Sequence, residues 1–286
     1  MLTRRVIPAI LIKDDWVVQS KGFGEFLPIG IPQIAVKYLS DWGADEILIL
    51  DISATKSNKK PNFSLIESCA TLSQVPLSIG GGVSNLEVAQ NLFHIGVEKV
   101  AINHAASSEL FSKIADKFGS QSIVLSLDVQ NVDGKNMVFD HKRSKHTDLT
   151  VYEKLSSLDN SLFGEVLIQS VDRDGSESGY DIESLSEICQ HTEKPIIALG
   201  GYGVPKDLEQ LFRETNVSAA AIGNRFHHSE HSLIVAKSSL GIDLNIRLET
   251  NARYDGIKTD KLGRISKREE EYLNELLYKK IEKEEI

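Results

Sequence analysis

The chain has 286 residues, of which 41% are hydrophobic and 26% charged, values typical of an ordinary globular protein. The formal net charge of -9 at pH 7 argues against binding nucleic acid through bulk charge. No apolar run is long enough to span a membrane, and residues 1–6 (MLTRRV) do not resemble a signal peptide. The expected compartment is therefore cytoplasmic, with no nucleic-acid or membrane partner. The two cysteines, Cys69 and Cys189, fit buried helical positions better than a disulfide.

In chain order, short apolar segments rich in β-branched residues alternate with helical patterns. The expected strands lie near residues 5–12, 46–52, 77–79, 99–102, 122–129, 165–170, 195–199 and 219–222. Residues 17–29 contain glycines and predict a loop long enough to act as a lid. Residues 131–150 interrupt the alternation with a turn sequence (VDGK) and an extended segment, which predicts an inserted β-hairpin.

The two halves of the chain repeat each other. Residues 46–51 (EILILD) are echoed by residues 165–170 (EVLIQS), and residues 76–82 (PLSIGGG) by residues 195–201 (PIIALGG). Strand–helix alternation with a half-length repeat predicts a (β/α)8 TIM barrel of two half-barrels over residues 1–250. Residues 251–286 form a C-terminal extension, in which a capping box at Ser266 and an apolar stripe predict an amphipathic helix at the end.

Glycines and asparagines follow matching strands in the two halves. A barrel carries its chemistry at the C-terminal ends of its strands, and glycine lets backbone N–H groups approach an anion closely. The pattern predicts two phosphate sites on opposite sides of the mouth, one at Gly82 and Asn103, the other at Gly201 and Asn224. The wider set expected to bind a phosphorylated small molecule adds Asp51, Asp174, Gly175, Gly200 and Gly223. Tight turns alone are the alternative interpretation of these glycines.

Acidic residues also end strands, and Asp128 is the best candidate for acid–base catalysis. The segment from Asp172 to Gly175 (DRDG) also fits a simple turn. His227, His228 and His231 lie close together without a convincing third ligand, so we expect no metal and no cofactor.

Four charged residues stand where strands begin, at the opposite end of the predicted barrel: Arg5, Glu46, Lys99 and Glu165. Alternating charges around that end predict a salt-bridged ring, and the ordinary role of this end of a barrel is stability.

Together these residues resemble the cyclase subunit of imidazole glycerol phosphate synthase, a barrel family of histidine biosynthesis. The resemblance runs from Met1 to about Glu249 and includes residues 5–8 (RVIP), 78–82 (SIGGG), 99–103 (KVAIN), 172–176 (DRDGS) and 245–249 (NIRLE). It implies a glutaminase subunit at the N-terminal end of the barrel and ammonia passing through the barrel to a bis-phosphorylated substrate. It also implies that Arg5, Glu46, Lys99 and Glu165 form the ammonia gate.

One departure from the family bears on catalysis. The family uses two catalytic aspartates, the second of which is Asp128 here, whereas the first falls on Leu11. An aliphatic side chain can neither give nor take a proton. Gln19 stands where the family carries a lysine, and Asn224 and Arg225 replace smaller residues beside the second phosphate site.

Three functions fit this pattern. The first is a divergent paralogue that channels ammonia in a glutamine-dependent amidotransferase complex, toward a sugar amidotransferase that makes acetamidino sugars for surface polysaccharides. The second is an ordinary cyclase in which another group replaces the acid missing at Leu11. The third is a non-catalytic barrel that only activates a glutaminase. Leu11 argues against the second, and the retained phosphate glycines argue against the third.

Overall fold

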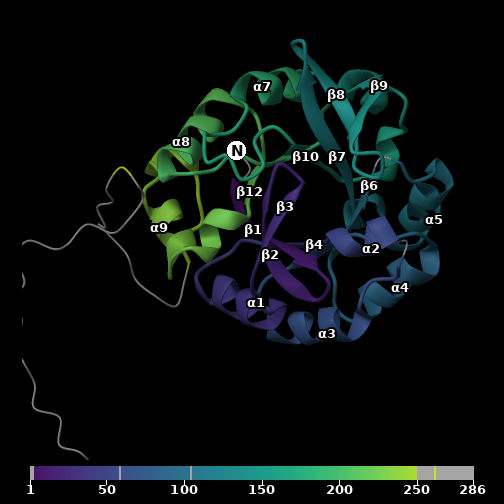
Figure 1. The fold of residues 1–286 in the computed structure, drawn as a ribbon, viewed down its shortest axis with the longest axis horizontal. Helices are drawn as coiled ribbons and strands as arrows, with labels where there is room; N and C mark the ends of the chain where they lie inside the picture. The colour runs from purple at the N-terminus through teal and green to yellow at the C-terminus, as the bar shows by residue number, and fades with distance from the viewer. Residues whose placement is uncertain (1–2, 58, 104, 250–260, 262–286) are drawn as a thin grey trace, which may run out of the picture.

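Eight parallel strands close into a barrel in the computed structural model, which describes residues 3–57, 59–103, 105–249 and 261 (Figure 1). Around the barrel the strands are β1 (Arg5–Lys13), β4 (Ile47–Asp51), β5 (Leu77–Gly80), β6 (Lys99–Asn103), β7 (Ile123–Val132), β10 (Glu165–Ser170), β11 (Ile196–Leu199) and β12 (Ala219–Ile222), and β12 pairs back to β1. This closure confirms the predicted (β/α)8 barrel.

Helices surround the strands as an outer layer (Figure 1). They are α1 (Pro32–Asp41), α2 (Ile52–Ser57), α3 (Phe63–Leu72), α4 (Leu86–His94), α5 (Ser108–Phe118), α6 (Val151–Ser156), α7 (Ile182–Gln190), α8 (Pro205–Glu214) and α9 (Ser232–Ser238), with short 3₁₀ turns at Ser120–Ser122, Asn160–Leu162, Asn224–His227 and Ile242–Leu244. Five helices begin at a polar cap whose side chain accepts the backbone N–H three residues on: Asn62, Asn85, Ser107, Thr150 and Asp181. Such caps satisfy otherwise unpaired N–H groups and fix where each helix starts.

The strands are buried on both faces, which explains their nearly continuous apolar runs. Their outward side chains pack against the helices in one large core. Their inward side chains form a second, smaller core inside the barrel that includes Ile7, Leu48, Val124, Leu167 and Ile197. The barrel interior is therefore packed below the mouth.

The prediction of a loop over residues 17–29 was wrong. This segment is a β-hairpin of β2 (Trp16–Lys21) and β3 (Glu25–Gly30), and β2 pairs antiparallel with the end of β1, Leu11 opposite Val18. Leaving β1, the chain reverses at Asp14 and Asp15, both with positive φ, and so continues the sheet beyond the barrel.

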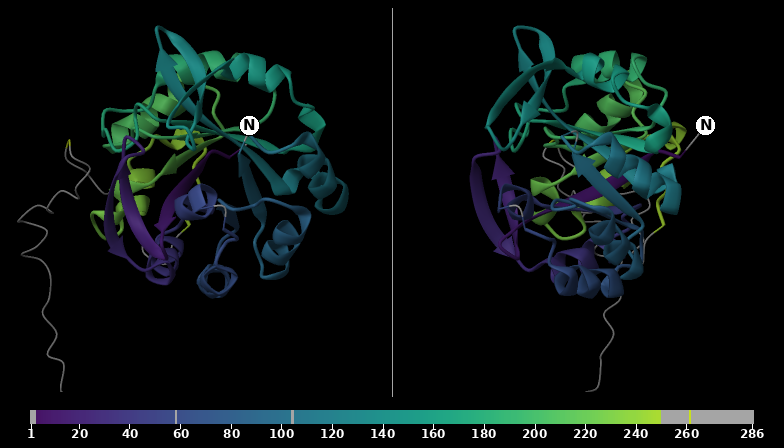
Figure 2. Two further views of the ribbon diagram at one scale, coloured as in Figure 1. Left: turned by 45° about the vertical axis from the view of Figure 1, so that its right-hand side comes forward. Right: turned by 90° about the vertical axis from the view of Figure 1, so that its right-hand side faces the viewer.

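A second hairpin rises from β7. This strand continues past Asp128 to Val132, so Asp128 lies within the strand and not at its end. β8 (Lys135–Asp140) pairs back on β7, and β9 (Lys145–Thr150) pairs with β8. Both hairpins project from one end of the barrel, and β1 begins at the other end (Figure 2).

The helix predicted near the end of the extension, beyond Ser266, lies outside the described residues. Within the described part of the chain, no helix is both long enough and apolar enough to cross a membrane.

Candidate functional site

The four charged residues predicted at the N-terminal end come together as a closed ring. Arg5 contacts Glu46 at 2.8 Å and Glu165 at 2.5 Å, and Lys99 contacts the same two carboxylates at 2.8 and 2.9 Å. Ser78 Oγ donates a further hydrogen bond to Glu46 at 2.5 Å. Charges alternate around the ring, so every member has two partners of opposite sign.

Burial and ion pairing have opposite effects on the pKa of Glu165 in this ring. Only 4% of the Glu46 side chain and 13% of the Glu165 side chain are exposed. Burial alone would raise the pKa of Glu165, but Arg5 and then Lys99 outweigh it and hold that pKa below its ordinary value. Glu165 therefore stays ionised at neutral pH and keeps its ion pairs with Arg5 and Lys99.

A cavity of about 590 Å³ opens at the other end of the barrel, a size usual for a small-molecule site. It lies beside the ends of β4 to β7, and the two hairpins supply part of its wall through Phe23, Phe26 and Phe139. Its polar lining includes Asp51, Asn103 and Asp128, three of the residues predicted from strand ends. Lys13 also lines it, with its ammonium group 4.2 Å from the centre of the Phe26 ring.

Asp128 is the centre of a small polar cluster in this cavity. Asn103 Nδ2 lies 3.5 Å from Asp128 Oδ2, and His141 Nδ1 lies 3.3 Å from the same oxygen. The other ring nitrogen of His141 is buried and has no hydrogen-bond partner within the described structure. Asp51 binds the start of α2 instead: its Oδ1 accepts hydrogen bonds from Ser53 N, Ser53 Oγ and Ala54 N.

Leu11 faces Asp128 across the mouth. β1 and β7 are separated by three strands in either direction around the barrel, so they lie on opposite sides. Leu11 is 7% exposed and lines the large cavity together with Asp128. The position opposite the aspartate is thus aliphatic, and proton transfer from that side has no protein group at residue 11.

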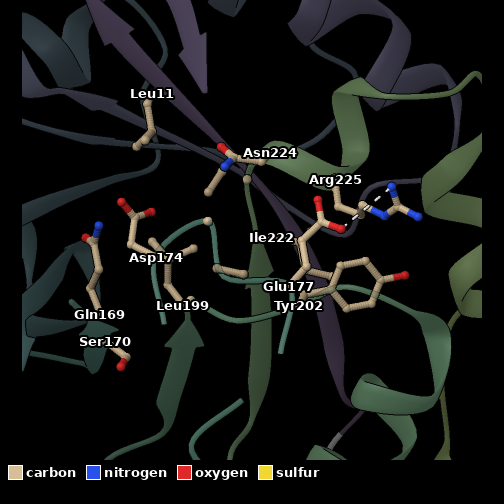
Figure 3. Close-up of a pocket in the computed structure, with 15 residues that line it drawn as sticks. Leu11, Gln169, Ser170, Asp174, Glu177, Leu199, Tyr202, Ile222, Asn224 and Arg225 are labelled. Atoms are coloured by element: carbon tan, nitrogen blue, oxygen red, sulfur yellow. Dashed lines mark ion pairs between the residues drawn. The ribbon is translucent and has the colours of Figure 1, made fainter. Parts of the chain in front are cut away.

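The large cavity occupies one half of the mouth, beside β4 to β7, and we call it the first half. The second half, beside the ends of β10 to β12, is nearly filled. A cavity of only about 40 Å³ lies there, with Leu11, Asp174 and Asn224 around it and with Glu177 and Arg225 on its other side (Figure 3). Gly175, Gly200 and Gly223 also line it. Five of the six residues predicted between Asp174 and Asn224, all but Gly201, therefore gather here, but around a space much smaller than that of the first half.

Gly82 and Gly201 lie beside these cavities and line neither of them. Both have positive φ, and a side chain at either would collide with backbone: the oxygen of Lys59 at Gly82, the oxygen of Gly179 at Gly201. Both glycines are required by close packing of the loops, whatever else their N–H groups bind.

Sequence reasoning missed His141, Gln169 and Ser126 as cavity residues. The available signal was the β7–β8 pairing, because a tight turn at Asp133 folds the segment before His141 back along the strand that carries Asp128. Among the described residues no group of three or more histidine, cysteine or acidic side chains could hold a metal ion.

Comparison with known proteins identifies relatives over most of the chain. A family model described as "Histidine biosynthesis protein" matches residues 5–232. Proteins of Vibrio vulnificus (37% identical over 267 residues, 92% of this chain and 98% of the relative) and Pseudomonas aeruginosa (38% over 239 residues, 82% and 95%) are each named "Putative imidazole glycerol phosphate synthase subunit hisF2". A Thermotoga protein named "Imidazole glycerol phosphate synthase subunit HisF" is 35% identical over 252 residues, 87% of this chain and 99% of the relative.

Proposed function

Because the chain belongs to the histidine biosynthesis protein family, we propose that it is the barrel subunit of a glutamine-dependent amidotransferase complex. It receives ammonia from a glutaminase partner at its N-terminal end and releases it at the mouth. The observation that carries this proposal is the contrast between the two ends: the charged ring is complete, whereas the mouth has Leu11 in place of an acid.

The ring supports a gate at the glutaminase side. Four ion pairs among four side chains form a plug that can open when one pair exchanges partners, since Arg5 and Lys99 share both carboxylates. A ring needed for stability alone could be replaced by apolar residues, often without loss. A docked glutaminase would shift the equilibrium from the closed ring toward the open ring.

The interior above the ring supports passage of a small neutral molecule. Four of its buried residues are alanines: Ala9, Ala101, Ala219 and Ala221. Neutral ammonia can cross such an apolar region, whereas the ammonium ion would lose its hydration without compensation. The upper end of this region is the large cavity, which Ala101 also lines.

The acceptor in this proposal is a separate sugar amidotransferase that makes acetamidino sugars for surface polysaccharides. An aliphatic residue opposite Asp128 suits a barrel that delivers ammonia without closing an imidazole ring itself. The extension beyond residue 249 would suit contact with that third protein.

A second candidate is the cyclase reaction of the family, in which the barrel combines ammonia with the phosphoribulosyl-formimino ribonucleotide to give imidazole glycerol phosphate and aminoimidazole carboxamide ribonucleotide. His141 favours it, because a histidine paired with Asp128 can move a proton. However, His141 contacts Asp128 itself, so it adds to the acid–base group on the β7 side and leaves the β1 side aliphatic at Leu11. We therefore rank this candidate second.

The test uses the purified chain with the glutaminase subunit encoded in the same genome. Glutamate release by the glutaminase should rise when the chain is added, and Glu165→Gln in the ring should reduce that stimulation. Lys37→Gln, which removes an exposed ion pair on α1, is the matched control and should not. A folded chain that neither binds nor stimulates the glutaminase would contradict the proposal.

A further inference from the structure

The two halves of the mouth differ because the β2–β3 hairpin is fixed to one of them. Asn224 holds the hairpin backbone from both sides: its Nδ2 donates to Ser20 O at 2.6 Å and its Oδ1 accepts from Ser20 N at 3.0 Å. Gln19 Nε2 donates to the backbone oxygen of Asn224 at 3.2 Å. An asparagine paired with a strand backbone in this way occupies the amide group that a free anion site would offer.

Asp174 strengthens the same attachment. Its Oδ2 accepts from Ser20 Oγ at 2.6 Å and from Phe23 N at 3.0 Å, and its backbone oxygen accepts from Gly22 N at 3.1 Å. Gly175 lies so close to the hairpin that a Cβ there would come within 2.4 Å of Ser20 O. Both N–H groups of the hairpin turn are therefore already bound, that of Phe23 by the Asp174 carboxylate and that of Gly22 by the Asp174 backbone oxygen.

Space and charge also disfavour a phosphate in this half. A volume of about 40 Å³ holds about three water molecules. The cation Arg225 lies 4.0 Å from Glu177 and donates its Nε to Gly203 O. Burial raises the pKa of Asp174 despite its hydrogen bonds from Ser20 and Phe23, and a phosphate beside it would add like charge.

The first half is far more open and carries side chains of both signs, because the carboxylates of Asp14, Asp51 and Asp128 line it as well. Its cavity of about 590 Å³ has Lys13, His141 and the Asn103 amide on its wall, and Gly81 bends there with a φ of +93°. The two cationic or protonatable side chains come from the end of β1 and from the second hairpin, and both reach the same space.

We propose that the mouth binds a ligand with a single phosphate or equivalent anionic group, anchored in the first half near Asn103, and that the Asn224–Ser20 contact closes the second anion site. The proposal deepens the proposed function by naming a ligand class for its mouth. It also gives a physical reason, separate from Leu11, why a bis-phosphorylated substrate would be handled poorly.

The experiment compares ribose 5-phosphate with ribulose 1,5-bisphosphate by isothermal titration calorimetry on the full chain. In the unaltered protein the two dissociation constants should agree within about threefold, because a second phosphate finds no site. Asn224→Ala should tighten binding of the bisphosphate at least about tenfold and change that of the monophosphate less than about threefold. Asn103→Ala should weaken both at least about tenfold.

Asn85→Ala is the matched control. It removes another asparagine hydrogen bond, at the start of α4 and outside both cavities, and should change neither dissociation constant. Bisphosphate binding more than about tenfold tighter than monophosphate binding in the unaltered chain would overturn the proposal. So would failure of both probes to bind, or an Asn224→Ala variant that behaves like Asn85→Ala. Because no glutaminase is present, the result is independent of whether the chain channels ammonia.

Discussion

We expect the charged ring to contribute measurably to the free energy of unfolding. Glu46→Gln keeps the shape of the side chain but removes the charge that faces Arg5 and Lys99, each at 2.8 Å. Removing one partner of a buried pair costs about 3–5 kcal/mol. Arg5 and Lys99 are partly exposed and keep Glu165, so we expect a loss of about 2–3 kcal/mol in the free energy of unfolding.

Urea denaturation at pH 7 measures this loss as a lower midpoint at an unchanged slope. The control is Lys37→Gln, whose exposed pair with Asp41 within α1 should be worth less than about 0.5 kcal/mol. A Glu46→Gln loss no larger than that of the control would refute the view that the ring is a coupled, desolvated network.

Three further predictions concern the mouth and two titratable groups. Leu11→Asp combined with Asn224→Ala should turn over the family's ribonucleotide with ammonium at least about a hundredfold faster than Asn224→Ala alone, whereas Leu11→Asp alone should gain little because the second anion site stays closed. Burial and then His228 lower the pKa of His227 to about 4. As the pH falls, the unfolded chain therefore protonates this histidine before the folded chain does. The free energy of unfolding should fall by roughly 2 kcal/mol as pH drops from about 6.5 to about 4. His227→Asn should flatten that dependence in urea midpoints measured across this range, and an unchanged profile would contradict the assignment. Burial raises the pKa of Cys69 to about 11, so at pH 8 its reaction with a disulfide reagent should be at least about a hundredfold slower in the native chain than in urea, and a fast native reaction would show that the thiol is accessible.

The barrel was predictable because its signals are local and repeated. Each parallel strand is a short apolar run buried on both faces, and the second half of the chain repeats the first with similar spacing. The charged ring could also be proposed from sequence, since its members stand at matching positions where strands begin.

The asymmetry of the mouth was not predictable in the same way. Glycines and a proline make residues 17–29 resemble a loop, and their pairing as a hairpin depends on the extension of β1. The contacts that fix the hairpin join residues far apart in sequence: Ser20 with Asp174 and Asn224. A symmetric pair of glycine motifs therefore predicted two similar sites, whereas tertiary contacts leave one half open and nearly fill the other.

We propose that this barrel delivers ammonia and does not close an imidazole ring. The most direct measurement is turnover of the family's substrate, the phosphoribulosyl-formimino ribonucleotide, by the folded, purified chain with an ammonium salt in place of glutamine. Ammonium bypasses the glutaminase, so the assay reports only on chemistry at the mouth. We predict no imidazole glycerol phosphate above background, because residue 11, opposite Asp128, is an aliphatic leucine that can neither give nor take a proton. Formation of imidazole glycerol phosphate at a rate usual for an enzyme, about 1 per second or faster, would contradict the claim.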